Sequence, residues 1–261
     1  MESQQLSCYL IEVLKKALLT IIAILILDQS LKIWVKLSFN YAQIKTVIPG
    51  WLDLQFVENP GMAFGWMIPG EGGKIALSVF RLIVVSGIAW YLYRIIKEKA
   101  HWGYIMCVSM IVAGAFGNIV DSAVYGVMFD RGSKFDPELN DYTMYFGKAQ
   151  MNYEGYAKPL MGNVVDMFHF TKKITWNDES FEIFPPIFNV ADASITMGII
   201  LIVLFQKRFF QRKHEELIPE IDPAAATEDG LTDATEIEVA QTNDDVSSES
   251  EIAKSDTSTK E

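Results

Sequence analysis

The sequence predicts an all-α membrane protein: a four-transmembrane-helix bundle with a small β-element outside the membrane and a disordered acidic C-terminal tail. Four segments each contain the roughly 20 mostly apolar residues that cross a bilayer, at 17–37, 74–96, 102–120 and 187–205. Half of the 261 residues are hydrophobic. The negative net charge is concentrated at one end, because residues 215–261 contain 15 acidic and only two basic side chains.

Two of the four segments carry charges that need an explanation. The first segment, 17–37, contains Asp28 and Lys32 in its second half, and no small-residue cleavage site follows it. We therefore expect a retained span rather than a cleaved signal peptide. The second segment, 74–96, carries Arg81 in its outer third, where a long side chain can extend its charged end toward water.

The tail, 215–261, has no aromatic residue and is rich in Thr, Ser and Ala. Such a segment buries too little apolar surface to offset the entropy lost on ordering, so we expect it to be disordered and solubilising. Residues 1–214 then form one membrane-embedded domain. Two cysteines, Cys8 and Cys107, exclude a disulfide scaffold and a multi-cysteine metal site. No basic array interleaved with aromatic residues indicates a nucleic-acid partner.

Basic residues gather at one set of helix ends, which sets the orientation of the spans. The sequence predicts that both termini lie in the cytoplasm and that the loops 38–73 and 121–186 face outward. The nine basic residues on the predicted cytoplasmic side are Lys15, Lys16, Arg94, Lys97, Lys99, Lys207, Arg208, Arg212 and Lys213.

The predicted outer loops contain signs of local structure. Residues 51–57 alternate apolar and polar side chains, which is typical of a short strand, and the turn Asn59-Pro60-Gly61 follows. Residues 174–183 favour a hairpin around Asn177-Asp178. Residues 127–163 are polar and lack a period, so we interpret them as an inserted outer loop.

Ionisable groups inside a span are costly and usually face the bundle interior with a partner. Asp28 and Lys32 are four residues apart on one helix face, where a local ion pair and a substrate-facing role are both open. Asn118 and Asp121 follow closely spaced small residues at the outer end of the third segment. Either a helix-end hydrogen bond or a functional role explains them.

Asp166 and Asp192 are the most informative pair. Each alone would be a helix cap or a loop carboxylate, but both fall at the predicted outer boundary of the membrane. Two neighbouring carboxylates in a partly desolvated site cannot both ionise cheaply, so they share one proton. The ionised one activates water and the protonated one polarises a peptide carbonyl. This is aspartic-protease chemistry, and it needs no metal and no cofactor.

Five sequence blocks, in order, resemble the lipoprotein signal peptidase family, also called type II signal peptidases. They are DQSLK (28–32), ENPGMAFG (58–65), AGAFGNIVD (113–121), VVDMF (164–168) and FNVADAS (188–194). The resemblance implies a bacterial inner-membrane aspartic endopeptidase, a hydrolase that cleaves diacylglyceryl-modified prolipoproteins just before the lipidated cysteine. It also implies contact with membrane lipid and inhibition by globomycin. We expect a monomer.

The resemblance also implies roles for individual residues. Asp166 and Asp192 match the catalytic pair, and the segment 59–65 is expected to cover the site. Asn59 and Asn189 are expected to position substrate or carboxylates, while the lipid arm enters between helices. The matches expected to shape the site or bind substrate are Asp28, Lys32, Asn59, Gly61, Asn118, Asp121, Asn189 and Ala191.

The chain departs from the family pattern in two places. Ser122 stands where the family has an arginine after the aspartate, and Arg131 or a loop lysine is the candidate substitute. The insertion 127–163 also makes Asp130 an alternative to Asp166 as the first catalytic residue. We prefer Asp166, because both valines before it and the phenylalanine of the motif are kept. His169 is interpreted as an interfacial residue.

Two other kinds of protein remain open on the sequence. A small proton- or ion-coupled transporter would use Asp28, Lys32, Asp121 and Asp192 as a relay and would need carboxylates at mid-membrane depth. A lipid-binding scaffold without activity would bind lipopeptide and leave it intact.

Overall fold

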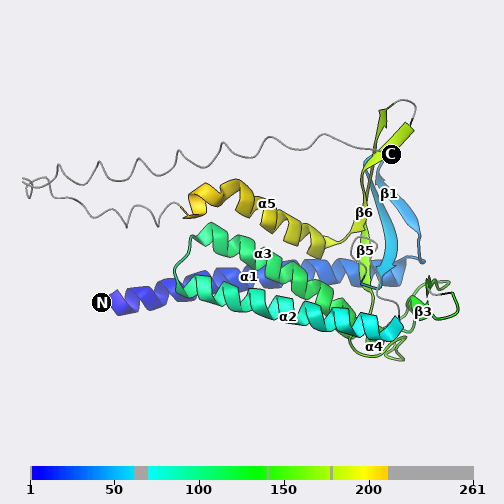
Figure 1. Cartoon of the computed structure of the whole chain (residues 1–261), viewed down its shortest axis with the longest axis horizontal. Helices are drawn as coiled ribbons and strands as arrows, with labels where there is room; N and C mark the ends of the chain where they lie inside the picture. The colour runs from blue at the N-terminus through cyan, green and yellow to red at the C-terminus, as the bar shows by residue number, and fades with distance from the viewer. Residues whose placement is uncertain (1, 62–69, 140, 177–178, 211–261) are drawn as a thin grey trace, which may run out of the picture. The chain divides into compact units, whose positions relative to one another are not determined.

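The computed structural model describes residues 2–61, 70–139, 141–176 and 179–210. Four long helices dominate this part of the chain: α1 (Glu2–Ser38), α2 (Gly70–Lys97), α3 (Trp102–Val120) and α5 (Val190–Phe210) (Figure 1). At its outer end α3 passes through one π-helical turn, η1 (Asp121–Tyr125), into the short helix α4 (Gly126–Met128). The predicted acidic tail lies outside the described residues.

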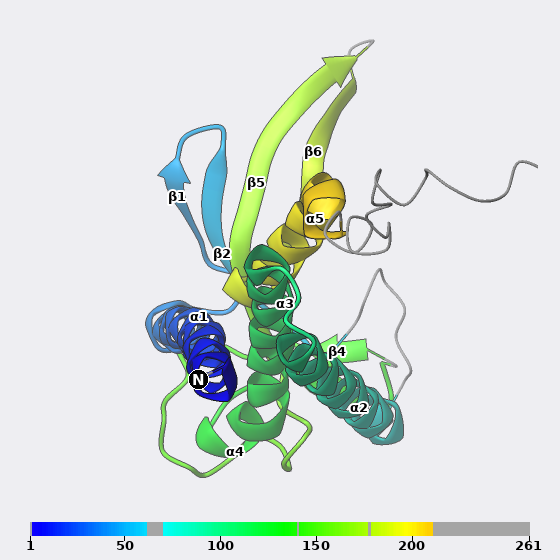
Figure 2. The same ribbon diagram turned by 90° about the vertical axis from the view of Figure 1, so that its left-hand side faces the viewer.

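Helix α3 is the centre of the bundle and packs against α1, α2 and α5 (Figure 2). Small residues on α3 make this close packing possible. A Cβ atom on Gly114 would lie 2.2 Å from the backbone oxygen of Ala191 on α5, and a Cβ atom on Gly117 would lie 2.8 Å from Asp28 on α1. Both neighbouring helices therefore approach α3 at positions that only glycine leaves open.

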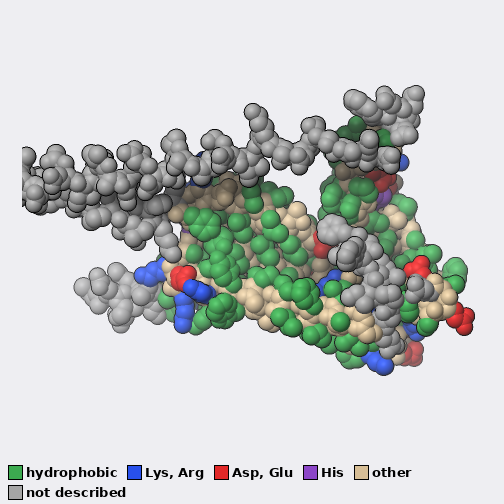
Figure 3. Space-filling model, in the orientation of Figure 1, with side chains coloured by type: hydrophobic (Ala, Val, Ile, Leu, Met, Phe, Trp, Pro, Cys, Tyr) green, Lys and Arg blue, Asp and Glu red, His purple; other side chains and the backbone are tan. Residues whose placement is uncertain are grey.

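Within the described part of the chain, three stretches of helix are long and apolar enough to cross a membrane: Gly72–Lys97, Trp102–Met128 and Val190–Phe210. They contain or overlap the second, third and fourth predicted spans. The first predicted segment, 17–37, is helical within α1, but α1 is not among these three. Apolar side chains cover the visible outer surface of the helices, as expected for contact with lipid (Figure 3).

A four-stranded antiparallel sheet lies at one end of the bundle, so the predicted all-α class is wrong. Its strands are β1 (Ile44–Ile48), β2 (Leu52–Asn59), β5 (Val164–Trp176) and β6 (Glu179–Phe188), in the order β1-β2-β5-β6. The predicted strand at 51–57 is confirmed as β2. The hairpin predicted at 174–183 is confirmed, but its two strands are much longer than predicted. Strand β5 also pairs with β2, and pairing between distant segments leaves no local pattern in the sequence.

The insertion 127–163 is more ordered than its composition indicated. It forms a small two-stranded sheet, β3 (Lys134–Asp136) and β4 (Asp141–Thr143). Its buried residues Phe129, Ala149 and Tyr156 share one apolar core with Phe56 of β2 and Val165 of β5. The insertion therefore supports the end of the sheet from which β5 starts.

Candidate active site

The ten residues predicted for the site come from six parts of the chain and lie around the junction of the bundle and the sheet. Helix α1 supplies Asp28 and Lys32, and the end of α3 with η1 supplies Asn118 and Asp121. Strand β5 carries Asp166, and the end of β2 carries Asn59, with Gly61 in the turn after it. The start of α5 supplies Ala191 and Asp192, with Asn189 just before it.

Asp166 is buried near the start of β5, opposite Val57 of β2. The amide Nδ2 of Asn189 donates to its Oδ1 at 2.6 Å, and the side chain of Asn59 also hydrogen-bonds this carboxyl. Burial, followed by the negative charge of Asp192, raises the pKa of Asp166 to about 8. The Asp166 carboxyl therefore holds a proton at neutral pH.

Asp192 lies in the first turn of α5, where the helix dipole favours a negative charge. Its Oδ2 accepts from the backbone N–H of Asn189 at 3.3 Å, and its own N–H donates to Oδ1 of Asn189 at 2.9 Å. This reciprocal pair caps the helix. Asn118 donates a further hydrogen bond to Oδ1 of Asp192 at 2.9 Å.

Asn189 contacts both carboxyl groups and is fully buried. Its Nδ2 donates to Asp166, while its Oδ1 and its backbone N–H bond Asp192. Asn189 thus connects two acids that lie 26 positions apart in the sequence, through its side chain to the Asp166 carboxyl and through its backbone N–H to the Asp192 carboxyl. It orients the two acids beside each other, as a shared-proton pair requires.

Lys32 is the centre of a buried charge network beneath the pair. Its Nζ lies 2.8 Å from Asp28 and 2.9 Å from Asp121, and all three side chains are inaccessible to solvent. It also donates to Oδ1 of Asn118 at 2.9 Å. Because Oδ1 faces Lys32, the amide donors of Asn118 face the other way, toward Asp192 and its neighbours.

Of the two explanations left open for Asp28 and Lys32, the local ion pair is confirmed, and the substrate-facing role stays a prediction. They form the local ion pair expected of residues four apart, and the same groups also join helices. Oδ1 of Asp28 accepts from the backbone N–H of Ala191 at 2.9 Å, which ties α1 to the first turn of α5. Oδ2 of Asp121 accepts from the backbone N–H of Val165 at 3.3 Å, which ties η1 to the start of β5.

Gln29 belongs to this network, although the sequence analysis did not select it. Its Nε2 donates to Asp121 at 2.8 Å and to the backbone oxygen of Gly117 at 3.2 Å, and its Oε1 accepts from the hydroxyl of Tyr125 at 3.1 Å. A polar residue between Asp28 and Lys32 in an apolar helix was the signal that would have identified it.

Asn59 and Gly61 form a tight turn at the mouth of the site. Oδ1 of Asn59 accepts from the N–H of Gly61 at 2.9 Å. Gly61 has φ +108°, a conformation that side chains disfavour, and a Cβ atom there would lie 2.7 Å from Leu77. Residues 62–65 of the predicted covering segment lie outside the described residues.

Arg81 of α2 is the second residue that the sequence analysis misjudged. Its guanidinium lies beside Gly61, within 4 Å of the position that a Cβ atom there would take. It also lies close enough to Asp192, Asp166 and Asp121 to interact with all three charges. Arg81 thus lies close to the acids, a contact that the predicted extension toward water did not include.

The other residues considered for the site point elsewhere. Arg131 donates to the backbone oxygen of Phe146 at 2.7 Å and contacts Asp130, so both belong to the insertion. His169 lies 3.3 Å from Glu182 on the neighbouring strand β6. Ser122 is buried and donates to the backbone oxygen of Asn118 at 3.1 Å.

Within the described parts of the chain, no group of three or more His, Cys, Asp or Glu side chains is arranged to hold a metal ion. The chemistry that the residues present can supply is the acid–base chemistry of two carboxyls. One is buried with a raised pKa, the other lies at the start of a helix, and a cationic guanidinium lies beside them.

Comparison with known proteins gives a consistent result. Residues 20–208 match the family model described as signal peptidase (SPase) II. The lipoprotein signal peptidase of Porphyromonas gingivalis is 36% identical over 197 residues, covering 72% of this chain and 81% of that protein. The lipoprotein signal peptidase of Amoebophilus asiaticus is 28% identical over 205 residues, covering 72% and 75%.

Among solved structures, the chain is similar in fold to a bacterial membrane enzyme determined at 2.3 Å resolution. The two share 20% sequence identity with a TM-score of 0.50, and the match covers 79% of this chain and 93% of that one.

Proposed function

Because the chain belongs to the signal peptidase II family, we propose that it is the membrane endopeptidase that removes signal peptides from lipid-modified prolipoproteins, with Asp166 and Asp192 as its catalytic pair. The observation that carries the assignment of the pair is the bridge through Asn189, whose side-chain amide donates to the Asp166 carboxyl and whose backbone N–H donates to the Asp192 carboxyl. The transporter alternative has no support from the relatives that were compared, because these are lipoprotein signal peptidases.

The two acids divide the reaction between them. Asp192, the ionised partner, removes a proton from water as the water oxygen attacks the scissile carbonyl carbon. Asp166, the protonated partner, transfers its proton to the carbonyl oxygen, giving a neutral gem-diol. Asp166 then recovers a proton from this diol as the C–N bond breaks, and Asp192 passes its proton to the leaving amine. Both acids end in their starting states, so no other reactant is consumed.

The remaining site residues position this pair. Lys32 compensates Asp28 and Asp121 and fixes the amide of Asn118 toward Asp192. Asp28 fixes Ala191 in the first turn of α5. Asn59 and Gly61 form the turn beside Asp166 and orient substrate there. Arg81 places a positive charge beside the acids, in place of the family arginine that Ser122 replaces.

The membrane arrangement follows from the same proposal. Helix α1 acts as the fourth span, because its large apolar residues Leu19, Ile22 and Ile26 are exposed where lipid would lie. The basic helix ends then place both termini in the cytoplasm and the acids at the outer surface. The lipid arm of the substrate enters between helices, cleavage occurs at head-group level, and the enzyme acts as a monomer sensitive to globomycin.

The test uses the purified full chain and a diacylglyceryl-modified prolipopeptide, with product measured by mass spectrometry in the presence and absence of globomycin. We expect cleavage before the lipidated cysteine, and a loss of about 10²- to 10⁴-fold in rate for Asp166→Asn and for Asp192→Asn. Asp130→Asn is the matched control, because its carboxylate serves only the insertion. Full activity in either dyad variant would refute the catalytic assignment.

A further inference from the structure

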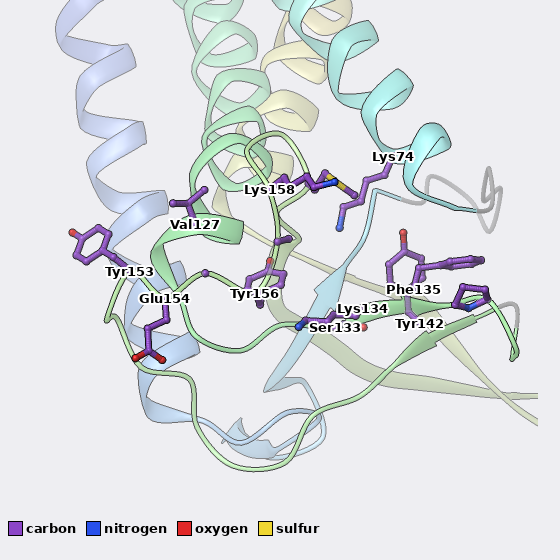
Figure 4. Close-up of a pocket in the computed structure, with 14 residues that line it drawn as sticks. Lys74, Val127, Ser133, Lys134, Phe135, Tyr142, Tyr153, Glu154, Tyr156 and Lys158 are labelled. Carbon is purple, nitrogen blue, oxygen red and sulfur yellow. The ribbon is translucent and has the colours of Figure 1, made fainter.

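A second candidate site lies between the start of α2 and the insertion. It is a cavity of about 730 Å³, which we call the insertion pocket. Lys74 of α2, Val127 of α4 and residues of the segment 133–161 line it, and none of the ten predicted site residues is among them (Figure 4). The pocket is therefore separate from the carboxyl pair.

Lys74 is the buried cation of this pocket, with only 7% of its surface exposed. Its ammonium group donates to Oδ1 of Asn163 and lies 5.5 Å from the centre of the Tyr142 ring. Among the side chains that the structure describes, which do not include that of Glu71, no carboxylate lies within ion-pair distance of it. A buried cation without a carboxylate partner is costly, and a bound anion would remove that cost.

The charge of Glu58 acts favourably on Lys74, but other groups already engage the Glu58 carboxylate. Glu58 forms a buried ion pair with Lys36. Its Oε2 also accepts from the backbone N–H of Ser133 at 2.7 Å and from Nδ2 of Asn163 at 2.7 Å. The buried network of Lys36, Glu58 and Lys74 thus carries one surplus positive charge when both lysines are protonated.

The remaining lining strengthens the positive character of the pocket. Lys134 adds a further cation, Lys158 lines the pocket with an interaction of its own, and Glu154 is the one acid among the lining residues. The aromatic lining residues provide apolar walls and hydroxyl donors: Phe135, Tyr142, Tyr153 and Tyr156. Figure 4 shows Lys74 and Lys158 reaching into the same space from opposite elements. Ammonium and phenol groups together suit an anion with several oxygens.

The depth of the pocket points to a lipid. Lys74 lies near the beginning of the apolar stretch Gly72–Lys97, and Val127 near the end of the stretch Trp102–Met128. Adjacent antiparallel spans bring these two ends to one face of the membrane, where head groups lie. Directly beside Lys74, the exposed residues Ile75, Val79 and Ile83 form an apolar stripe down α2 on which an acyl chain can lie.

We propose that the insertion pocket binds the phosphate group of an anionic membrane phospholipid, with Lys74 as its buried contact and Lys134 and Lys158 at its rim. The same phosphate chemistry is available from soluble phosphate, but the stripe beside Lys74 favours an occupant with acyl chains. A lipid bound here is separate from the peptidase substrate. The experiment measures lipid binding and not cleavage, so its result is independent of the proposed peptidase activity.

The test measures retained lipid by native mass spectrometry on the full chain in detergent, titrated with phosphatidylglycerol. We expect the double variant Lys134→Gln/Lys158→Gln and the single variant Lys74→Met each to weaken binding about tenfold or more. Lys74 also holds Asn163, so the rim variant provides a test that leaves this buried hydrogen bond in place. Lys148→Gln, an exposed lysine of the same insertion outside the pocket, is the matched control and should bind normally.

Three further probes decide the chemistry. Zwitterionic phosphatidylcholine should bind at least about tenfold more weakly than phosphatidylglycerol. Inorganic phosphate should compete only at far higher concentration, and competition at equal concentration would overturn the lipid source. Preferential binding of a short aspartate peptide, equal binding of both lipids, or unchanged binding in both lysine variants would overturn the proposal itself.

Discussion

Asn189 combines two tasks that usually fall to different residues. Its side chain caps α5 by accepting the N–H of Asp192, and the same amide donates to Asp166. Replacement by Ala removes both contacts at once, whereas Asp keeps the cap but places a third negative charge between two acids. We therefore regard Asn189 as the residue on which the alignment of the catalytic pair depends.

For Asn189→Ala we expect a loss of about 10²-fold or more in kcat and a loss of about 1 kcal/mol in the free energy of unfolding. Lipopeptide cleavage and thermal unfolding in detergent measure the two effects. Asn152→Ala is the control, because Asn152 is exposed and bonds only a turn of the insertion. An unchanged kcat in the Asn189 variant would show that the bridge is dispensable.

The raised pKa of Asp166 sets the pH dependence. Since Asp166 must donate a proton, kcat/KM should fall as pH rises through about 8, the value for the folded enzyme. The folded state also binds this proton more tightly than the unfolded chain, whose aspartates titrate near pH 4. Stability should therefore decrease as pH rises between about 4 and 8.

Thermal unfolding measured across this pH range tests the contribution to stability. In Asp166→Asn, which cannot titrate, the decrease in stability between about pH 4 and 8 should become smaller. A wild-type rate that keeps rising well above pH 8, or an identical stability profile in the two proteins, would contradict the assigned protonation state.

Arg81 provides a third test at a single side chain. Arg81→Gln removes the cation beside Asp192 and Asp166, and we expect kcat/KM to fall about tenfold or more, because opposite charges a few ångströms apart in a protein interact by about 1–4 kcal/mol. Arg81→Lys should recover part of this loss. The control is Arg131→Gln, whose guanidinium bonds the insertion. Equal effects of the Arg81 and Arg131 variants would exclude a specific role.

Among the secondary-structure elements, the contact between α3 and its neighbours is the tightest. Gly114 faces the backbone oxygen of Ala191, so an added methyl group would push back the first turn of α5, which carries Asp192. We expect Gly114→Ala to lower the free energy of unfolding by about 1–3 kcal/mol and to reduce cleavage.

Gly87→Ala is the matched control for this substitution. Gly87 lies within α2, and nothing lies within 4 Å of the position that its Cβ atom would take. Alanine there should be neutral or slightly stabilising, because it favours the helix. Thermal unfolding in detergent distinguishes the two variants. Equal stability would show that α5 accommodates the added methyl group with no loss in the free energy of unfolding.

The sequence predicted helices better than strands for a physical reason. Helices of membrane length are continuous in sequence, so their apolar runs reveal them, as 102–120 does for α3. The pairing of β2 with β5 joins segments more than 100 positions apart, and no local pattern records it. The positions around the acids were predictable because polar residues such as Asp28 and Asn118 stand out against apolar neighbours. The position of the Arg81 side chain was not predictable in this way, because this side chain lies against the turn at Gly61.

For the chain as a unit, the domain boundary at residue 214 remains a prediction. A chain that ends at residue 214 should cleave lipopeptide at the rate of the full-length protein, because no described site residue follows Asp192. The comparison uses both proteins in the same detergent, with Asp192→Asn in each as the inactive control. A large loss of rate on truncation would assign the tail a part in catalysis.

Helix α1 contacts two different parts of the molecule near its C-terminal end. Lys36, on its last turn, is buried against Glu58 of β2 and the aromatic rings of the insertion, while Lys32, one turn earlier, serves the acids. Helix α1 thus contacts both the network beneath the two acids and the insertion. A ligand that binds the insertion and displaces Lys36 should therefore also displace Lys32 and change the rate of cleavage, without occupying the site of the two acids.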